Sequence, residues 1–198
     1  MLLTIKNEIL KTRELIDEIY NNDSFLNEVQ KIITCCTNAL SAGKKILFAG
    51  NGGSAADSQH LAAELVSRLK FDRPALRAVS LTVDTSALTA IGNDYGYKHV
   101  FSRQISALGD EGDVFFAIST SGNSENILTA LQEAQQRKLI TVGFTGKSGG
   151  KMKDICTHIL CIPSQETPKI QEGHILLGHI ICECIEYALF SQLKQKAA

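Results

Sequence analysis

The sequence lacks a charge excess, a long apolar run and a targeting segment. Among its 198 residues, 20 Lys and Arg stand against 21 Asp and Glu, which gives a net charge of −1. A protein dedicated to nucleic acid usually has a basic excess, so no nucleic-acid partner is expected. No stretch reaches the ~18 uninterrupted apolar residues of a membrane span. Because residues 1–20 also lack the apolar block of a signal peptide, we expect a cytoplasmic protein with no membrane partner.

The sequence also lacks linkers, repeats and metal-type cysteine spacing. It has three prolines, no Pro-rich or Ser-rich tract and no internal repeat. Its length therefore fits one domain of roughly 150 residues or a little more. Hydrophobic residues make up 44% and charged residues 21% of the chain, which is close to globular averages and disfavours disorder. The six cysteines match neither a zinc knuckle nor a zinc ribbon. We expect buried, reduced thiols at Cys35, Cys36, Cys156, Cys161, Cys182 and Cys184.

Two N-terminal helices are predicted, followed by alternating strands and helices. Apolar residues recur at spacings near three and four within residues 1–42, with a break at 22–24. Strands are expected at residues 45–49, 74–81, 113–118, 139–144 and 156–162, and helices at 55–70, 85–93, 100–108, 125–137 and 169–193. Mostly apolar strands that alternate with helices predict an α/β fold, in which a parallel sheet has helices on both faces.

Two polar loops are expected at the carboxyl ends of strands, where ligands bind in parallel sheets. The first is GNGGS at residues 50–54, called here the glycine loop. Its glycines would let a ligand approach the backbone closely. It formally fits a dinucleotide fingerprint, but no acidic residue closes the next strand. No Lys follows the glycines, so the Walker pattern fails as well. A turn that needs glycine for its geometry explains this loop equally well.

The second loop is STSGNS at residues 119–124, called here the serine loop. It places four hydroxyls at the start of a predicted helix. One hydroxyl is enough for a helix cap, whereas several hydroxyls with free backbone N–H groups suit a phosphate. The loop brings no Lys or Arg and no evident Mg²⁺ ligand. It is therefore predicted to bind a spectator phosphate, because phosphoryl transfer normally needs a cation at the reacting group.

Candidate side chains for chemistry lie on two of the predicted helices. His60 and Glu64 share one helical face, although such pairs are common on protein surfaces. Gln171 and His179 lie ~80° apart around the last helix and could border one cleft, although a lone core histidine is the default interpretation of His179. His174 lies ~140° from His179 around the axis, so we expect it to be packed or at an interface.

A further motif, GNDYG at residues 92–96, contains Asn93 and Asp94. These side chains could belong to a turn only. They could equally form hydrogen bonds with a polyol. Together with the serine loop, they point to a phosphorylated ligand that carries many hydroxyl groups.

In this order, the motifs resemble the sugar-isomerase (SIS) family. The resemblance rests on residues 50–54, 90–96, 119–124, 145–147 and 170–172, with His60 and Glu64. It implies a five-stranded parallel sheet in a three-layer α/β/α SIS domain over residues 1–198, with an N-terminal helical pair in 1–42 and the α/β core in 43–198. It also implies a homotetramer with active sites at subunit interfaces.

A narrower resemblance within the family, carried by the same motifs, implies a specific reaction. An aldose–ketose isomerase would convert sedoheptulose 7-phosphate to D-glycero-D-manno-heptose 7-phosphate through an enediolate, as the first step of nucleotide-activated heptose biosynthesis. Glu64 would be the catalytic base and His179 its acid/base partner. The residues implied to bind the phosphate are Ser119, Thr120, Ser121 and Ser124. Those implied to contact the sugar are Asn51, Gly52, Gly53, Asn93 and Asp94, with Glu64 and Gln171 also bordering the substrate.

The resemblance further implies a zinc ion, which some family members hold among four side chains. The equivalent positions in this chain are His60, Glu64, Gln171 and His179. Two histidines with a glutamate and a glutamine are a plausible Zn²⁺ set. If zinc occupies Glu64 and His179, neither group is fully free to move a proton, so the role of the ion is left open.

The sequence departs from the family pattern in small ways at residues 166–169, just before Gln171, and leaves three alternatives open. Some relatives carry an acid three residues before the glutamine, but here that position is Pro168, so no third acid is assigned. The chain could be a non-catalytic SIS-fold binding protein of the replication-initiator-associating type, an isomerase for another sugar phosphate, or a sugar-phosphate-sensing module. The binding protein lacks equivalents of Glu64 and His179, and both are present here.

Overall fold

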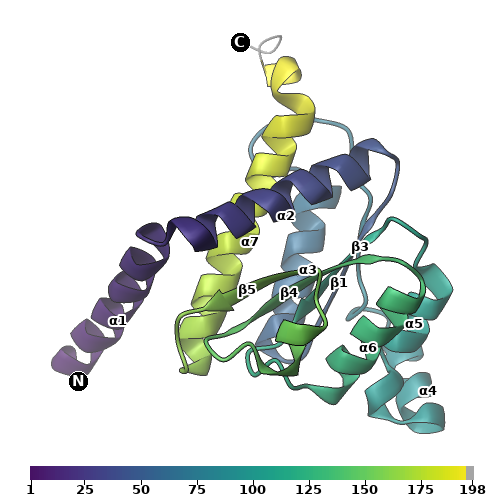
Figure 1. Ribbon diagram of the computed structural model, residues 1–198, viewed down its shortest axis with the longest axis horizontal. Helices are drawn as coiled ribbons and strands as arrows, with labels where there is room; N and C mark the ends of the chain where they lie inside the picture. Colours follow the sequence, from purple (N-terminus) through teal and green to yellow (C-terminus); the bar gives the residue numbers. More distant parts are fainter. Residues whose placement is uncertain (195–198) are drawn as a thin grey trace.

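A parallel sheet of five strands carries the candidate ligand loops at its carboxyl edge. The computed structural model describes residues 1–194 (Figure 1). The strands are β1 (Ile46–Gly50), β2 (Ala78–Ser80), β3 (Val114–Ile118), β4 (Ile140–Gly146) and β5 (His158–Ile162), in the spatial order β2-β1-β3-β4-β5. All neighbouring strands pair in parallel. The strand order reverses between β1 and β3, and ligands bind at such switch points in open α/β sheets.

The central strands are apolar on both faces because helices cover both faces of the sheet. Every residue of β1 and β3 is buried. Phe48 and Phe116 point into one core, whereas Leu47 and Phe115 point into the other. The first core includes α1 (Leu2–Tyr20), α2 (Asp23–Ser41), α3 (Gly53–Val66) and α7 (Thr167–Lys194). The second includes α4 (Thr85–Tyr95), α5 (Ser102–Leu108) and α6 (Glu125–Gln136). The architecture is therefore a three-layer α/β/α sandwich, as predicted.

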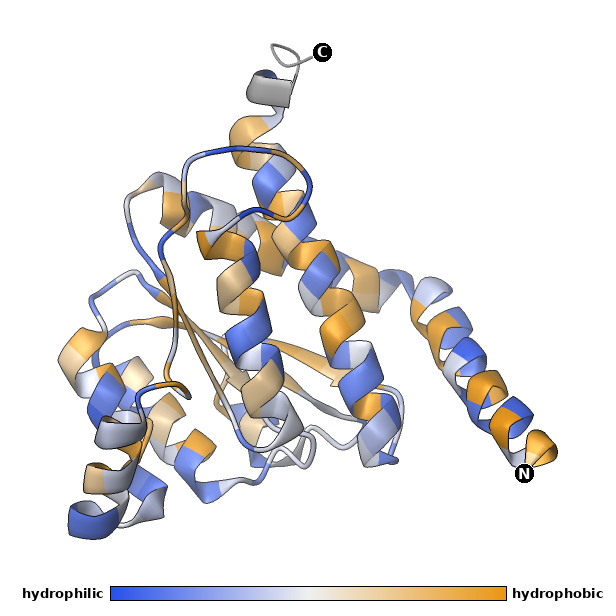
Figure 2. Ribbon diagram, turned by 180° about the vertical axis from the view of Figure 1, so that it is seen from behind, coloured by the Kyte–Doolittle hydropathy of each residue, from blue (hydrophilic) through white to orange (hydrophobic). Residues whose placement is uncertain are grey.

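Helix α1 projects away from the sheet and leaves apolar side chains exposed (Figure 1). Its buried residues are Leu15 and Ile19, whereas Leu2 is 66% and Ile9 is 65% exposed. Figure 2 shows hydrophobic and hydrophilic residues alternating along this open helix. A row of exposed apolar side chains on an amphipathic helix is typical of an interaction surface.

The other end of α1 is tied to the start of α7 by polar contacts. Lys169 is 6% exposed, and its Nζ donates to Thr12 at 2.8 Å and to Glu172 at 2.9 Å. Thr12 Oγ1 in turn donates to Glu172 at 2.6 Å. The first turns of α7, which carry Gln171, therefore have a fixed position relative to α1.

The structure confirms the predicted strands and the N-terminal helical pair, but it changes several boundaries. The strand expected at 74–81 spans only Ala78–Ser80, because Leu76 instead donates its backbone N–H to the Leu65 carbonyl at the end of α3. The helix expected at 55–70 is Gly53–Val66. The helix expected at 100–108 begins at Ser102, after a 3₁₀ turn at Tyr97–His99. Residues 195–198 of the predicted domain lie outside the described part of the chain.

The cysteines are reduced, as expected, but not all are buried. All six are free thiols, and only Cys36 and Cys182 are fully buried, while the other four are half-buried. Burial raises the pKa of the Cys182 thiol to about 12. A thiol with a raised pKa stays protonated and unreactive, so Cys182 acts as a small apolar residue in the core.

Helix α7 has the length and apolar composition of a membrane span. Its segment Thr167–Gln192 has a mean hydropathy of 1.3, and 44% of the apolar window is buried inside the fold. The apolar side chains of this helix belong to the first core, together with those of α2 and α3. We therefore interpret α7 as a core helix, whose hydropathy reflects its packing.

Candidate functional site

The candidate site lies along the line where α3 and α7 are in contact, called here the α3–α7 seam. Glycines set this close contact. A Cβ on Gly178 would lie 2.6 Å from the Leu61 side chain, and a Cβ on Gly53 would collide with the Gln171 amide. Gly52 caps α3 with φ +58°, a conformation that L residues rarely adopt. The glycine loop predicted at the end of β1 is therefore needed both for its turn and for helix packing.

Three polar side chains meet across the seam. Nε2 of His60 lies 2.7 Å from Nε2 of His179 and 3.3 Å from Oε1 of Glu64. The two histidine rings meet edge to face, with centroids 4.9 Å apart. The side chain of His60 is 47% exposed and that of Glu64 is 18% exposed. The structure thus brings together three of the predicted site residues, in a cluster that a small ligand can reach.

This cluster suits either a metal ion or proton transfer. One nitrogen or oxygen atom from each of His60, Glu64 and His179 lies within 4.8 Å of the others. Two imidazoles and a carboxylate are a ligand set of catalytic zinc sites, which keep a fourth position open. The same side chains are also those that enzymes most often use as general acids and bases.

Gln171, the fourth predicted zinc ligand, lies farther along the seam. Its amide packs against Gly53, which precedes His60 by seven residues. At 1.5 Å per residue, that separation is about 10 Å along the axis of α3. Gln171 thus contacts the glycine loop, and its role as a zinc ligand stays a prediction.

Asn51 is held by two residues that sequence analysis missed. Nδ2 of Asn51 donates to Oδ1 of Asn126, and Nδ2 of Asn126 donates to Oδ1 of Asn51, both at 2.9 Å. The Tyr97 hydroxyl also donates to Oδ1 of Asn51 at 2.9 Å. Asn126 is 4% exposed and lies in the first turn of α6, so this amide pair joins the glycine loop to the serine loop. No local pattern reveals a partner 75 residues away.

The serine loop turns sharply before α6 and leaves the start of that helix open. Gly122 adopts φ +65°, and a Cβ there would collide with the carbonyl of Gly149. Ser124 is the N-cap residue of α6, but its side chain makes no cap hydrogen bond. Its Oγ lies instead 3.0 Å from Oγ of Ser119. Hydroxyl groups and the free backbone N–H groups of a helix N-terminus, when they lie together, form a site that favours a phosphate.

A hollow of about 350 Å³ lies beside the serine loop. Thr120 and Ser121 line it from the loop, Lys147 from the segment after β4, and Thr167 from the start of α7. The loop itself has no cation, and Lys147 supplies one from a neighbouring loop. Lys147 belongs to one of the motifs that carry the family resemblance, but the sequence assigned it no role, because this cation comes from a different strand end. A wider groove of about 1380 Å³ lies elsewhere, between α2 and β5.

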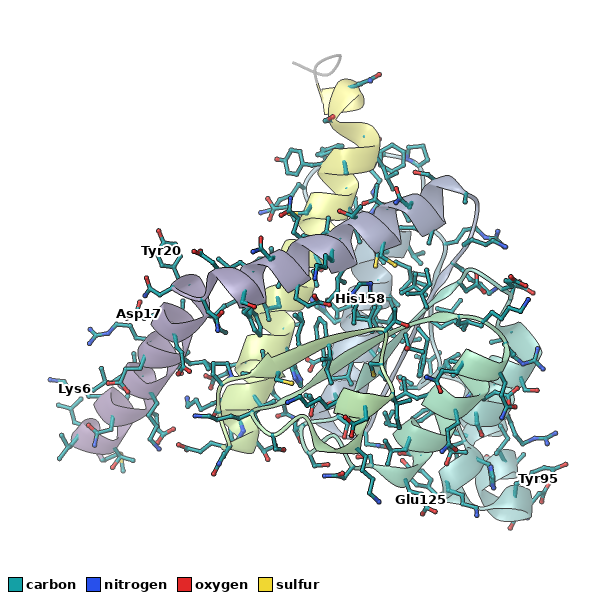
Figure 3. All side chains as sticks on the ribbon, viewed as in Figure 1. Lys6, Asp17, Tyr20, Tyr95, Glu125 and His158 are labelled. Atoms are coloured by element: carbon teal, nitrogen blue, oxygen red, sulfur yellow. The ribbon has the colours of Figure 1, made fainter. Side chains whose placement is uncertain are left out.

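Asn93 and Asp94 belong to the last turn of α4, and not to a separate turn. Both are exposed, and Nδ2 of Asn93 donates to Oδ1 of Asp94 at 2.7 Å. Figure 3 shows Tyr95, the last residue of α4, at the same end of the molecule as Glu125, where the serine loop leads into α6. The predicted contact of Asn93 and Asp94 with a sugar stays a prediction.

Asp57 is a further ionisable group beside the cluster. It lies on α3, one turn before His60, and its Oδ2 is buried without a hydrogen-bond partner. Burial raises the pKa of this carboxyl, while the charge of His60 opposes the shift. Asp57 is not among the residues predicted from sequence, because nothing in its local sequence distinguishes it from an ordinary helix carboxylate.

His174 is packed beneath the serine loop, as predicted. It is 1% exposed, and Nε2 donates to the Thr145 carbonyl at 3.2 Å. Its ring centroid lies 5.5 Å from that of Phe144. Burial lowers the pKa of His174 to about 4, although the Thr145 carbonyl partly opposes the shift. The residue is a neutral part of the core and not a member of the cluster.

Comparisons with known proteins find relatives that match almost the whole chain. The family model of the SIS domain matches residues 10–146. The chain is 52% identical over 188 residues to a phosphoheptose isomerase of Burkholderia pseudomallei (strain K96243), and this alignment covers 95% of each chain. It is 52% identical over 186 residues to one from Aneurinibacillus thermoaerophilus, covering 94% of each. The solved phosphoheptose isomerase from Neisseria gonorrhoeae superposes with a TM-score of 0.88 at 41% identity, covering 93% of this chain and 98% of the other.

The low pKa of His174 predicts a loss of stability in mild acid that a single substitution removes. The unfolded histidine has a pKa near 6.5, so between pH 6.5 and 4 the unfolded state binds more protons and stability falls as pH falls. This group should cost about 2 kcal/mol between pH 7 and pH 5. Urea unfolding of wild type and His174→Gln at both pH values measures the difference. Equal pH dependence in the two proteins would contradict the assignment.

Proposed function

We infer that this chain, which belongs to the SIS-domain family and within it to the phosphoheptose isomerases, converts sedoheptulose 7-phosphate to D-glycero-D-manno-heptose 7-phosphate. This aldose–ketose isomerisation is the first step of nucleotide-activated heptose biosynthesis. The observation that carries the inference is the meeting of Glu64 with His60 and His179 across the α3–α7 seam. The reaction needs a base and a second group that exchanges the oxygen protons, and the carboxylate and imidazoles at the seam can fill these roles.

The serine loop would hold the phosphate of the substrate. Its hydroxyls lie at the open N-terminus of α6, where backbone N–H groups and the helix dipole favour an anion. Lys147 at the adjoining hollow would add a positive charge. The phosphate ligands in this proposal are Ser119, Thr120, Ser121 and Ser124.

The sugar would extend from the serine loop toward the seam. Asn51 is fixed by Asn126 and Tyr97, so its amide is already oriented for a ligand. The glycine loop lets hydroxyl groups approach the backbone where side chains would otherwise stand. The sugar contacts in this proposal are Asn51, Gly52, Gly53, Glu64, Asn93, Asp94 and Gln171.

Proton transfer would use Glu64 and His179. A carboxylate on one face of the sugar can remove the proton from one carbon and return it to its neighbour, so Glu64 is the base of the enediolate step. The protons on the two oxygens must move as well, and His179 would exchange them. The 2.7 Å contact between His60 and His179 fixes the position of the His179 ring.

Zinc would be held by the same cluster. His60, Glu64 and His179 offer suitable donors, and Gln171 is the proposed fourth ligand. A bound Zn²⁺ supplies Lewis-acid stabilisation of negative charge on the substrate oxygens. His60 would then serve the metal alone, whereas Glu64 and His179 would serve both the metal and the proton transfers.

A homotetramer with active sites at subunit interfaces is the proposed assembly, in the cytoplasm. The exposed apolar residues of α1 support an interface between copies of the chain. The six free cysteines fit a reducing compartment. A non-catalytic SIS-fold binding protein is less well supported, because such a protein needs no cluster of Glu64 and His179.

Replacement of Glu64 should abolish turnover and leave substrate binding intact. Glu64→Gln keeps the shape of the side chain but removes the base, so kcat should fall at least about a thousandfold. Conversion of sedoheptulose 7-phosphate is followed by NMR in chelated protein, with and without added Zn²⁺. Glu133→Gln, which alters another helical glutamate with a partner at i+4, is the control. A wild-type kcat in Glu64→Gln would contradict the role of Glu64 as the base. If the wild-type protein binds sugar phosphate but does not convert it, the binding-protein alternative would be favoured.

Removal of hydroxyls from the serine loop should weaken phosphate binding without affecting chemistry. The double variant Ser121→Ala with Ser124→Ala loses two hydrogen bonds to a charged group, so KM should rise about tenfold or more while kcat changes little. Steady-state kinetics provide both constants. Ser106→Ala on α5 controls for the loss of a hydroxyl elsewhere. An unchanged KM would remove Ser121 and Ser124 from the phosphate site.

A charge on the apolar face of α1 should break the assembly. Ile9→Asp places a carboxylate on the exposed apolar face, whereas Asn7→Asp places one on the opposite face of the same helix. Wild type and Asn7→Asp should sediment with a mass about four times that of the 21.5 kDa chain, and Ile9→Asp as smaller species. Monomeric wild type, or an intact Ile9→Asp tetramer, would refute this use of α1.

A further inference from the structure

The end of α3 is held by a buried arginine from the following loop. Arg73 is 8% exposed, and its guanidinium side chain is fully buried. Its Nη2 donates to the Glu64 carbonyl at 2.8 Å, and its Nη1 donates to the Leu65 carbonyl at 2.6 Å. The last carbonyls of a helix have no partner within the helix, and a cation there also complements the helix dipole. Arg73 therefore fixes the backbone of the turn that carries Glu64.

A buried carboxylate on α7 holds the same loop. Glu186 is 0% exposed, and it accepts the backbone N–H groups of Leu69, Lys70 and Phe71 at 3.0 to 3.3 Å. Its Oε2 lies 3.8 Å from Nη2 of Arg73. The loop after α3 is thus attached to α7 through one carboxylate, and Arg73 links that carboxylate to the end of α3.

Two outer contacts support this attachment. Lys70 forms an ion pair with Glu183 at 3.3 Å. The ring of Phe71 meets the ring of Tyr187 edge to face, with centroids 5.4 Å apart. Both partners lie within three residues of Glu186 on α7, so the loop follows one short stretch of that helix.

The position of this attachment couples it to the cluster. Glu186 follows His179 by seven residues, which is about two turns of α7 on nearly the same face. Glu64 lies in the last turn of α3. The link through Arg73 and Glu186 therefore fixes the end of α3 against α7 close to where Glu64 faces His179.

We propose that Arg73 and Glu186 are positioning residues for Glu64, which set the rate of proton transfer without contacting the substrate. This inference rests on the proposed function of Glu64 as the base. A buried ion pair is a weak source of stability, because desolvation offsets the attraction. Its directed hydrogen bonds, however, fix two helices in one register, and misplacement of a catalytic group by about 1 Å can cost a hundredfold in rate.

The substrate phosphate would lie far from this link. A Cβ on Gly146 would contact both the Thr120 carbonyl and the Ile170 side chain, so the serine loop lies beside the start of α7. Glu186 follows Ile170 by 16 residues, which is about 24 Å along the helix axis. Disturbance of the link should therefore change kcat and leave KM nearly unaltered.

Two conservative variants test the proposal. Arg73→Lys keeps the charge but cannot reach both carbonyls in the same way, and Glu186→Gln keeps the shape but loses the charge. The matched control is Asp113→Asn, which alters a carboxylate that is 1% exposed and accepts the backbone N–H groups of Lys45 and Asp110. We expect kcat to fall about tenfold in both test variants, with KM for sedoheptulose 7-phosphate within about twofold of wild type. Asp113→Asn should be destabilised but keep wild-type kcat at temperatures where it is folded.

Amide hydrogen exchange gives a readout that does not depend on activity. In Arg73→Lys, the amides at the end of α3, Leu65 to Ser67, should exchange about tenfold faster or more, while those of α6 stay unchanged. Wild-type kcat and exchange rates in Arg73→Lys would overturn the proposal, as would a fall in kcat of equal size in Asp113→Asn. If wild type itself lacks turnover, the proposed function fails, and unaltered exchange would separately refute the link. If Glu186→Gln does not fold, Arg73→Lys carries the test, because it keeps the buried charge.

Discussion

The contact between α3 and α7 decides where the three clustered side chains lie, because His60 and Glu64 belong to one helix and His179 to the other. The two helices approach each other closely at Gly53 and at Gly178, where glycine removes a side chain. A Cβ at Gly178 would collide with Leu61, so the helices would separate beside the cluster. Packing in the core therefore fixes the spacing of the polar groups at the surface of the same seam.

Different lengths of α7 serve different tasks. Its first turns lie beside the serine loop and the glycine loop and carry Gln171. Its middle carries His179, and its later turns carry Glu186. Binding of a phosphate needs hydroxyls and N–H groups at loop and helix ends, whereas proton transfer needs side chains at fixed positions on rigid helices. Under the proposed function, this arrangement would separate substrate affinity at one end of α7 from the rate of chemistry farther along the helix.

The parts of the fold that follow from local patterns were predictable from sequence, and the parts that depend on distant contacts were not. Apolar runs without alternation identified buried parallel strands such as β1 and β3, and helical spacing placed His60 and Glu64 on one face. The strand expected at 74–81 was too long, because its first residues fold back onto the end of α3. Asn126 and Tyr97, which orient Asn51, and Arg73, which holds the turn of Glu64, each gain their role from a tertiary partner.

In a single chain, the cluster of His60, Glu64 and His179 is partly exposed to solvent. This exposure offers a chemical reason for the proposed homotetramer. An enediolate carries negative charge and reacts with water-borne protons, so a site that forms one must limit access by solvent. In this chain the side chain of His60 is 47% exposed, and the hollow beside the serine loop is open to the surface. A second copy docked through α1, as proposed, would lie near the start of α7, since α1 is attached there next to Gln171 through Lys169 and Thr12. The proposed completion of the active site at a subunit interface would account both for the exposed apolar face of α1 and for the incomplete enclosure of the site.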